Sequence, residues 1–168
     1  SISLALSSFG DKVIWLIGIS FFIARGFIKT GLGSRIAYLF IRVFGRSSLG
    51  LGYGLGLADL VLAPAIPSNT ARGGGIIYPI MKSMALNFGS IPEKPETHRK
   101  LGAYLSLNCY NVNLITSSMF LTGTASNPMC QKFAADLGIN ITWMSWMWAA
   151  LVPGLISLIA VPYILYKI

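Results

Sequence analysis

Long apolar runs alternate with short basic segments along this chain. Residues 13–28 form one run that reaches, with its flanks, the ~20 residues that a helix needs to cross a bilayer. Residues 143–166 form a second, longer run with aromatic side chains at both ends, where such side chains mark membrane interfaces. We therefore predict membrane helices over residues 12–30 and 141–167. Arg25, inside the first helix, is expected to extend toward the nearer interface, because a charge in lipid is costly.

The segment from residue 32 to 46 has an amphipathic pattern. Its apolar residues recur at helical spacing, and its arginines share the opposite face of the helix. Those arginines are Arg35, Arg42 and Arg46. This pattern predicts a helix that lies in the membrane interface and contacts lipid. A second basic stretch runs from Lys94 to Lys100, and we expect both stretches on the cytoplasmic side, because positively charged connections favour that side.

Residues 48–88 lie between those two basic stretches and must leave one membrane side and return to it. Two full spans would satisfy that requirement, but alternate glycines and two prolines, Pro64 and Pro67, occupy the first arm. The middle of the segment holds three polar residues before three consecutive glycines; these are Ser68, Asn69 and Thr70. Non-helical backbone at membrane depth is tolerated only where protein or a water-filled cavity supplies hydrogen-bond partners. We therefore predict a re-entrant helical hairpin with a binding site at its tip.

One carboxylate, Asp59, lies in the first arm of this hairpin. It can pair with an arginine such as Arg72, or it can face a water-filled vestibule. Because a charge at membrane depth is stabilised by a partner, we favour the pair.

A polar stripe follows one side of the next helix. Its members are Asn108, Asn111, Ser118 and Thr122. Such a stripe either forms hydrogen bonds between helices or lines a permeation path. The segment then loses its helical pattern, because Gly123 and Pro128 both disturb helical hydrogen bonding and Asn127 precedes the proline. We predict one membrane helix over residues 99–138 that is broken at this point.

The polar hairpin tip and the broken helix together indicate a transport site. Discontinuous helices in transporters offer free N–H groups and a positive dipole end to an anion, and unwound carbonyl groups to a cation. The residues expected to bind a substrate carboxylate are Ser68, Asn69, Thr70, Thr124 and Asn127. A coupling sodium ion would use oxygens of Ser68, Asn69 and Gly123. The residues expected to support the site are Thr122, Pro128, Asn108 and Asn111.

The composition agrees with a protein that resides in a membrane. Hydrophobic residues make up 54% of the chain and charged residues 11%, with a mean hydropathy of +0.67, whereas soluble domains hold about 25% charged residues. The net charge of +8 comes from Lys and Arg between apolar runs and not from a basic face interleaved with aromatics, which argues against nucleic acid. Cys109 and Cys130 lack the spacing of a zinc site or a disulfide framework, so we assign them to packing.

Enzyme chemistry lacks the residues it needs. His98 is the single histidine in the sequence and lies in a polar linker, so neither a Ser–His pair nor a histidine-ligated metal is indicated. The glycines at residues 73–75 lack the lysine and hydroxyl of a phosphate-binding loop. A non-transporting structural subunit stays open as an alternative, but it would not need a polar tip at membrane depth.

Three stretches of the sequence carry a resemblance to a known family. They are GDKVIWLIGISFFIARGFIKTGLGSRIAYLF at residues 10–40, LAPAIPSNTARGGGIIYPI at residues 62–80 and TGTASNP at residues 122–128. The chain resembles the divalent anion:sodium symporter family, and within it the 2-oxoglutarate/malate translocators of plastids and bacteria. The resemblance covers nearly the whole chain. It implies an all-α integral membrane protein with two inverted repeats, of which this chain is a fragment, residues 1–168 forming the first repeat as a single transport unit.

The resemblance also implies a function and its site. The implied function is secondary active transport of C4 and C5 dicarboxylates such as 2-oxoglutarate and malate, by a homodimer of the full-length protein in a bacterial inner membrane or a plastid inner envelope. Ser68 and Asn69 fall on family positions for the first sodium ion and the substrate carboxylate. The sequence departs from sodium-coupled members at residues 125–126, where prolines are usual, and at Pro64, where a hydroxyl is favoured. Dicarboxylate exchange and sodium-coupled uptake are therefore both open, and transport of another anion such as citrate or sulfate is the alternative.

Overall fold

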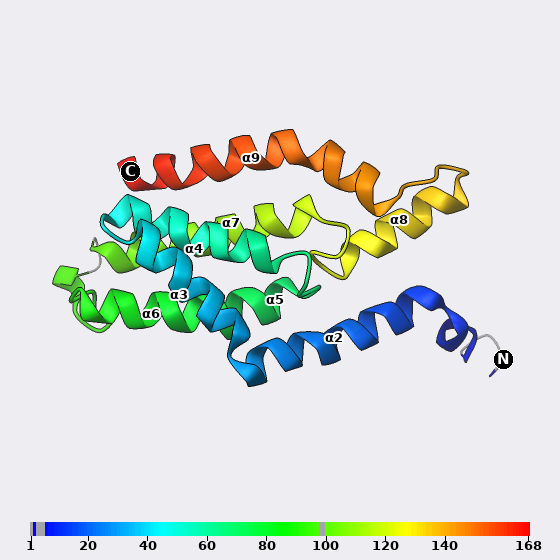
Figure 1. The fold of residues 1–168 in the computed structure, drawn as a ribbon, viewed down its shortest axis with the longest axis horizontal. Helices are drawn as coiled ribbons and strands as arrows, with labels where there is room; N and C mark the ends of the chain where they lie inside the picture. Colours follow the sequence, from blue (N-terminus) through cyan, green and yellow to red (C-terminus); the bar gives the residue numbers. More distant parts are fainter. Residues whose placement is uncertain (1, 3–5, 98–99) are drawn as a thin grey trace.

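The computed structural model describes residues 2, 6–97 and 100–168, and every regular element within these ranges is helical (Figure 1). The expectation of an all-α chain is therefore confirmed. The elements are η1 (Ser7–Gly10), α2 (Lys12–Thr30), α3 (Leu32–Phe44), α4 (Ser48–Leu62), α5 (Asn69–Arg72), the π-helix η2 (Gly73–Ile77), α6 (Tyr78–Asn87), η3 (Pro95–Thr97), α7 (Leu101–Met119), α8 (Ser126–Asp136) and α9 (Trp143–Lys167). His98, considered above for catalysis, lies outside the described residues.

The first two long helices meet at a glycine. α2 ends at Thr30, and Gly31 has a φ of 68°, a left-handed conformation that glycine adopts without strain. α3 leaves this joint at an angle of 62° to α2. The face that α3 buries consists of small residues, Gly33 and Ala37, which allow it to approach the hairpin closely. α3 ends at Phe44, shortly before the predicted end at residue 46.

The hairpin consists of α4, an irregular turn and a continuous helical return arm. α4 begins after Ser47, whose side chain accepts a hydrogen bond from the backbone N–H of Gly50 at 3.0 Å. The alternate glycines leave α4 helical and instead let neighbouring helices approach, since a Cβ on Gly54 would lie 3.2 Å from the carbonyl oxygen of Phe40 on α3. The return arm runs without interruption through α5, η2 and α6. Figure 1 shows the two arms antiparallel, with the tip near the middle of the molecule.

α7 and α8 are the two halves of the broken helix. α7 ends at Met119 and α8 begins at Ser126, so the irregular stretch between them overlaps the predicted break. Gly123 lies in this stretch, and its backbone N–H donates to the carbonyl oxygen of Phe120 at 2.8 Å. Pro128, which was expected to disturb helical hydrogen bonding, does not do so. It lies in the first turn of α8, where the missing N–H of a proline costs no helical hydrogen bond.

α9 is the described helix that is long and apolar enough to cross a membrane by itself, and the bent pair of α2 and α3 meets the same criterion when the two are taken together. α9 begins with a capping box, in which Thr142 and Ser145 exchange hydrogen bonds between their side chains and backbone N–H groups. Within its apolar part, 17% of the residues are buried in the chain. The remaining side chains are available to lipid or to other helices.

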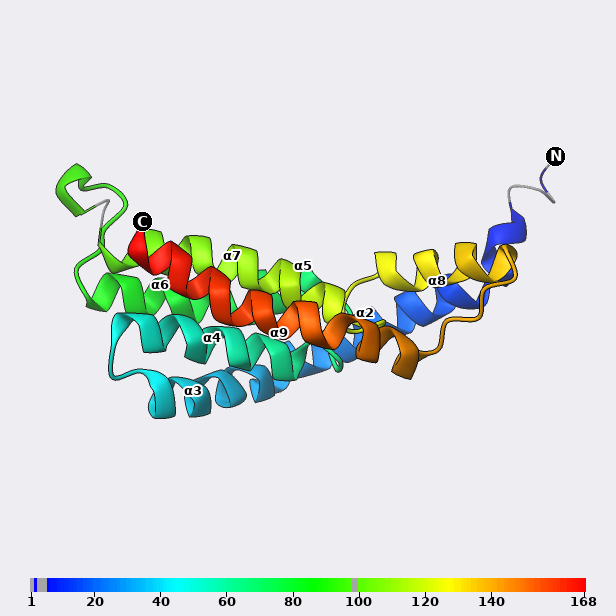
Figure 2. The same ribbon diagram turned by 90° about the horizontal axis from the view of Figure 1, so that it is seen from above.

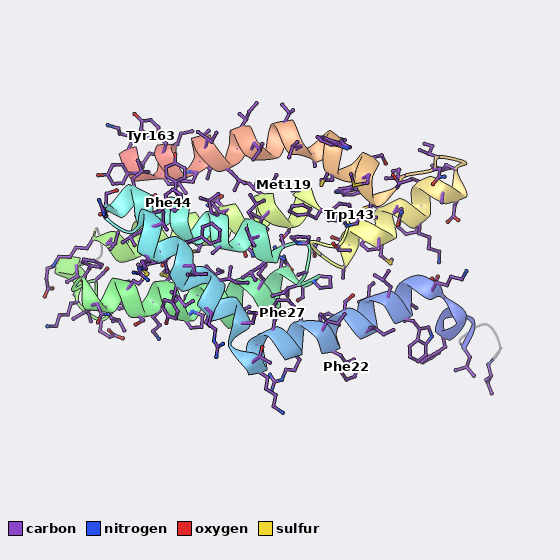
Figure 3. All side chains as sticks on the ribbon, viewed as in Figure 1. Phe22, Phe27, Phe44, Met119, Trp143 and Tyr163 are labelled. Carbon is purple, nitrogen blue, oxygen red and sulfur yellow. The ribbon has the colours of Figure 1, made fainter. Side chains whose placement is uncertain are left out.

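The core lies between α3, α4, η2, α6 and α7, and α9 packs against α4 and α7. Its fully buried apolar side chains include Leu55, Ile66, Ile76 and Leu105. α2 and α8 project from this bundle (Figure 2), and Lys132 of α8 forms an ion pair with Asp11. Figure 3 shows Phe22 pointing outward, where it is 82% exposed, whereas Phe27 packs against the core. Large apolar side chains of this kind on the outer surface are expected in lipid and are uncommon in water.

Candidate functional site

Side chains of the hairpin tip form hydrogen bonds with its own backbone. Ser68 has an extended backbone, and its Oγ accepts a hydrogen bond from the N–H of Ala71 at 3.2 Å. Asn69 Oδ1 accepts one from the N–H of Thr70 at 2.9 Å. Neither bond uses the hydroxyl hydrogen of Ser68 or the side-chain amide hydrogens of Asn69. The tip therefore presents hydrogen-bond donors at the start of a helical run, where the helix dipole favours an anion.

A cavity of about 390 Å³ lies at this tip. Its polar lining consists of Ser68, Asn69, Thr70 and Thr124, and Phe21 of α2 forms part of its wall. The structure therefore brings together four of the five residues predicted to bind a carboxylate. They come from the hairpin and from the loop between α7 and α8, as the two motifs together suggested. None of the described residues that line this cavity is acidic.

Asn127, the fifth predicted ligand, has a different role. Its side chain is buried, and its Nδ2 donates to the carbonyl oxygens of Ser117 and Phe120, each at 2.8 Å. It thereby satisfies carbonyl groups that the end of α7 leaves without helical partners. Asn127 is also absent from the lining of the tip cavity. It holds the first turn of α8 against the end of α7.

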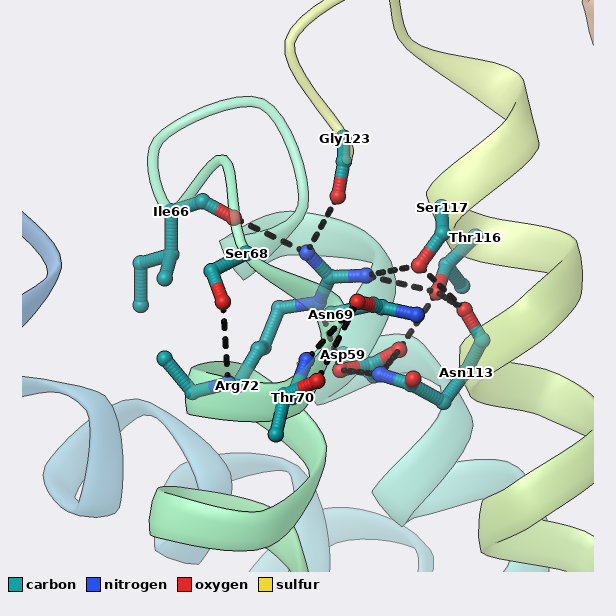
Figure 4. Close-up of polar contacts among 11 residues, drawn as sticks. Asp59, Ile66, Ser68, Asn69, Thr70, Arg72, Asn113, Thr116, Ser117 and Gly123 are labelled. Carbon is teal, nitrogen blue, oxygen red and sulfur yellow. Dashed lines mark hydrogen bonds and ion pairs between the residues drawn. The ribbon is translucent and has the colours of Figure 1, made fainter. Parts of the chain in front are cut away.

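A buried arginine lies behind the tip. Arg72 is 0% exposed, and its Nε donates to Asp59 Oδ1 at 2.8 Å, which confirms the favoured pairing. Its Nη1 donates to the carbonyl oxygens of Ile66 at 2.9 Å and Gly123 at 3.1 Å. Figure 4 shows the guanidinium between these two oxygens, one from the hairpin turn and one from the broken helix. One side chain therefore connects both halves of the site.

Three residues of α7 complete this buried network and were missed by sequence reasoning. They are Asn113, Thr116 and Ser117. Asn113 Nδ2 donates to Asp59 Oδ2 at 3.2 Å, the hydroxyl of Thr116 donates to the same oxygen, and Arg72 Nη2 donates to Ser117 Oγ at 2.7 Å. Their spacing of three and four residues is itself a helical polar stripe, so the signal was present on a second face of the helix. With these bonds both charged groups are paired and hydrogen-bonded, as burial requires.

The three residues considered for sodium are not arranged as one group. Gly123 does not line the cavity that Ser68 and Asn69 share. Its carbonyl oxygen already accepts a hydrogen bond from the guanidinium of Arg72. Because this oxygen already accepts from a guanidinium N–H, the arrangement disfavours sodium at Gly123.

The four supporting residues divide into separate roles. Thr122 Oγ1 donates to the carbonyl oxygen of Pro64 at 3.0 Å and thereby joins the loop to the hairpin turn. Asn108 is fully buried and donates to the carbonyl oxygen of Gly52 at 3.0 Å, which is a bond between helices and not part of a permeation path. Asn111 donates to the carbonyl oxygen of its own helix at Leu107. Pro128, as described, starts α8.

Comparisons with known proteins place this chain among transporters. The family model described as "Sodium:sulfate symporter transmembrane region" matches residues 1–168. The chain is 57% identical to "Putative malate transporter YflS" of Bacillus subtilis over an alignment of 169 positions, which covers 100% of this chain and 35% of that protein. It is 54% identical to "Dicarboxylate transporter 1, chloroplastic" of Spinacia oleracea (99% of this chain, 29% of that protein) and 46% identical to "Inner membrane protein YbhI" of Escherichia coli (96% and 34%). The chain thus spans about a third of the length of these relatives.

Proposed function

Because this chain belongs to the sodium:sulfate symporter transmembrane family, we propose that it forms part of a secondary active transporter of C4 and C5 dicarboxylates such as 2-oxoglutarate and malate. The family is one of integral membrane transporters, in agreement with the resemblance found in the sequence. Relatives of this chain are named for dicarboxylates or malate. The proposal extends the dicarboxylate specificity in these names to the protein that contains this chain.

The observation that supports it is the cavity at the hairpin tip. The Ser68 hydroxyl and the Asn69 amide present donors there, and Thr124 lines the cavity from the other motif. Hydrogen bonds from such donors to a carboxylate are stronger than those between neutral groups. The nearest buried carboxylate, Asp59, is neutralised by Arg72 and does not repel an anion. A dicarboxylate has a second charged end, which a second set of donors would hold, and we assign that set to an inverted second repeat.

For the coupling mode we favour exchange of one dicarboxylate for another. Arg72 donates to the carbonyl oxygens of Ile66 and Gly123, and oxygens of that kind are what a sodium ion would bind. A fixed guanidinium in this position joins the hairpin to the broken helix without a bound ion. Sodium-coupled uptake is the alternative, with oxygens of Ser68 and Asn69 left as ligands.

The proposed setting follows the named relatives. We propose a homodimer of full-length subunits in contact with lipid, in a bacterial inner membrane or a plastid inner envelope, because relatives are named as chloroplastic proteins and as an inner membrane protein. Citrate or sulfate is the alternative substrate, and sulfate is the anion in the description of the family. A non-transporting subunit is disfavoured because the tip cavity keeps polar groups at membrane depth.

Reconstitution of the full-length protein in liposomes tests these proposals. Uptake of labelled malate is measured with 2-oxoglutarate inside or absent, each with and without a sodium gradient. Uptake that requires internal 2-oxoglutarate and ignores sodium is the expected result. Sodium-driven uptake into empty liposomes would instead identify a symporter, and failure to take up either acid would direct the same assay to citrate and sulfate.

A further inference from the structure

We propose that a groove along the return arm of the hairpin leads from the tip to the basic linker, and that Lys82 at its far end is a transient binding site for the transported anion. The proposal rests on the proposed function for the identity of that anion. It assigns a role to the surface along η2, α6 and α7, beyond the tip itself. The groove lies between η2 and α6 on one side and α7 on the other.

The groove consists of three cavities in sequence. The tip cavity shares Asn69 and Thr70 with a second cavity of about 430 Å³. The second shares Tyr78 and Ser106 with a third of about 760 Å³. The return arm is helical between Thr70 and Lys82, and this stretch is about 18 Å long at 1.5 Å per residue. A path of that length connects the tip to the end of the hairpin.

Glycines keep the middle of this path open. Gly73 and Gly74 both line the second cavity. A Cβ on Gly74 would have no atom within 4 Å, and a Cβ on Gly73 would lie 3.2 Å from the side chain of Asn113. Side chains at these positions would therefore project into the groove or press on α7. The absence of side chains there leaves backbone polar groups near the path of a small polar solute.

Among the described residues, charged side chains line the groove at its far end. The described residues that line the first two cavities are all uncharged, whereas the third is lined by Lys82 and Glu93. Within the described part of the chain, Lys82 is exposed and has no ion pair. The linker also carries Lys94, Arg99 and Lys100 against Glu96, and this net positive charge raises the local concentration of anions near the opening. Glu93 lies in the same lining as Lys82 and weakens its attraction for an anion, which favours transient binding.

The thiol of Cys109 can serve as a chemical probe inside this groove. It lines the second cavity, and it is half-buried. An anionic thiol reagent that enters by way of the third cavity passes Lys82 on its way to Cys109, whereas a cationic reagent of similar size experiences the opposite field there. The ratio of the two modification rates therefore measures the charge at the opening, whatever the transported substrate is.

The experiment uses the full-length protein in liposomes. The rate at which Cys109 is modified is followed by peptide mass spectrometry, with sulfonatoethyl methanethiosulfonate as the anionic reagent and its trimethylammonioethyl counterpart as the cationic one. We expect the anionic reagent to be favoured in the wild-type protein. Lys82→Gln should lower the ratio about sevenfold and Glu93→Gln should raise it about sevenfold, because one charge at about 7 Å in water changes each rate about threefold and in opposite directions for the two reagents. Lys82→Arg should keep the wild-type ratio, and Lys94→Gln, in the same linker but outside the cavity lining, should change it less.

Two results would overturn the proposal. The first is a Cys109 that neither reagent modifies, because the groove would then be closed. The second is a ratio that Lys82→Gln changes no more than Lys94→Gln does. Malate exchange is measured in the same liposomes. If exchange is absent but the ratio of modification rates still depends on Lys82, the proposed substrate is rejected and the groove is kept as a path for anions.

Discussion

Arg72 Nη1 donates a hydrogen bond to the carbonyl oxygen of Gly123, 3.1 Å away and 51 residues further along the chain. The same nitrogen donates to the carbonyl oxygen of Ile66 at 2.9 Å. The hairpin turn and the loop of the broken helix are thus joined to one side chain, whose charge is balanced by Asp59. If one half of the site moved without the other, the buried guanidinium of Arg72 would lose one of its hydrogen-bond partners, which is costly. The two halves are therefore expected to move together.

The pair of Asp59 and Arg72 should show strong energetic coupling. Asp59→Asn and Arg72→Gln are each expected to lower the free energy of unfolding by about 3–5 kcal/mol, because each leaves a buried charge without its counter-charge. The double variant should lose less than the sum of the two. Thermal unfolding of the full-length protein in detergent, followed by tryptophan fluorescence, measures all three. Losses that simply add would contradict the coupling.

Asn69 should be necessary for transport but not for folding. Asn69→Ala removes an amide that lines the tip cavity and is expected to reduce malate uptake by about 10- to 100-fold, the equivalent of one hydrogen bond to a charged group. Asn111→Ala is the matched control, because that amide bonds to its own helix. Uptake in liposomes and elution on a sizing column are measured for both. Normal uptake by Asn69→Ala would argue heavily against the assigned site.

Thr124 and Asn127 should behave differently although they are close in the sequence. Thr124 lines the tip cavity, so Thr124→Ala is expected to raise the KM for malate several-fold with little change in Tm. Asn127 donates to the carbonyl oxygens of Ser117 and Phe120, and the latter also accepts from the N–H of Gly123, so Asn127→Ala should lower stability by about 1–3 kcal/mol chiefly through the carbonyl group of Ser117. The comparison of KM and Tm separates the two roles. Equal effects on both quantities in the two variants would contradict it.

Gly52 should not tolerate a side chain. A Cβ there would collide with the hydroxyl of Tyr104 on α7, so Gly52→Ala is expected to cost about 1–3 kcal/mol. The Oη of Tyr104 is buried without a hydrogen-bond partner among the described residues, and Tyr104→Phe should restore part of that loss in the double variant, because the ring carbon Cζ would still lie 2.8 Å from the added Cβ. Gly18→Ala on α2 is the control, because its Cβ would meet no atom within 4 Å. Unfolding temperatures of the four variants decide whether this contact limits the approach of α4 to α7.

The sequence predicted well what local chemistry determines. The apolar run before Gly31 has the length of α2, and the polar residues between two prolines and three glycines form the hairpin tip. Pro128 was misjudged because a proline is compatible with both the end and the first turn of a helix. Asn113 was missed because polar residues recur on more than one face of α7. Only the packing of α7 against the hairpin decides which of those faces lies toward Asp59.

Asn69 and Thr70 border two different cavities, one that reaches Phe21 and Thr124 and one that continues along α6 and α7. A carrier must let its ligands be reached from opposite membrane sides in turn. If Asn69 and Thr70 bind the substrate as proposed, open space on both of their flanks means that the binding site does not have to be rebuilt between the two states. The two states then differ in which flank is closed. Access changes from one membrane side to the other because surrounding parts of the protein move, while the ligands keep their arrangement.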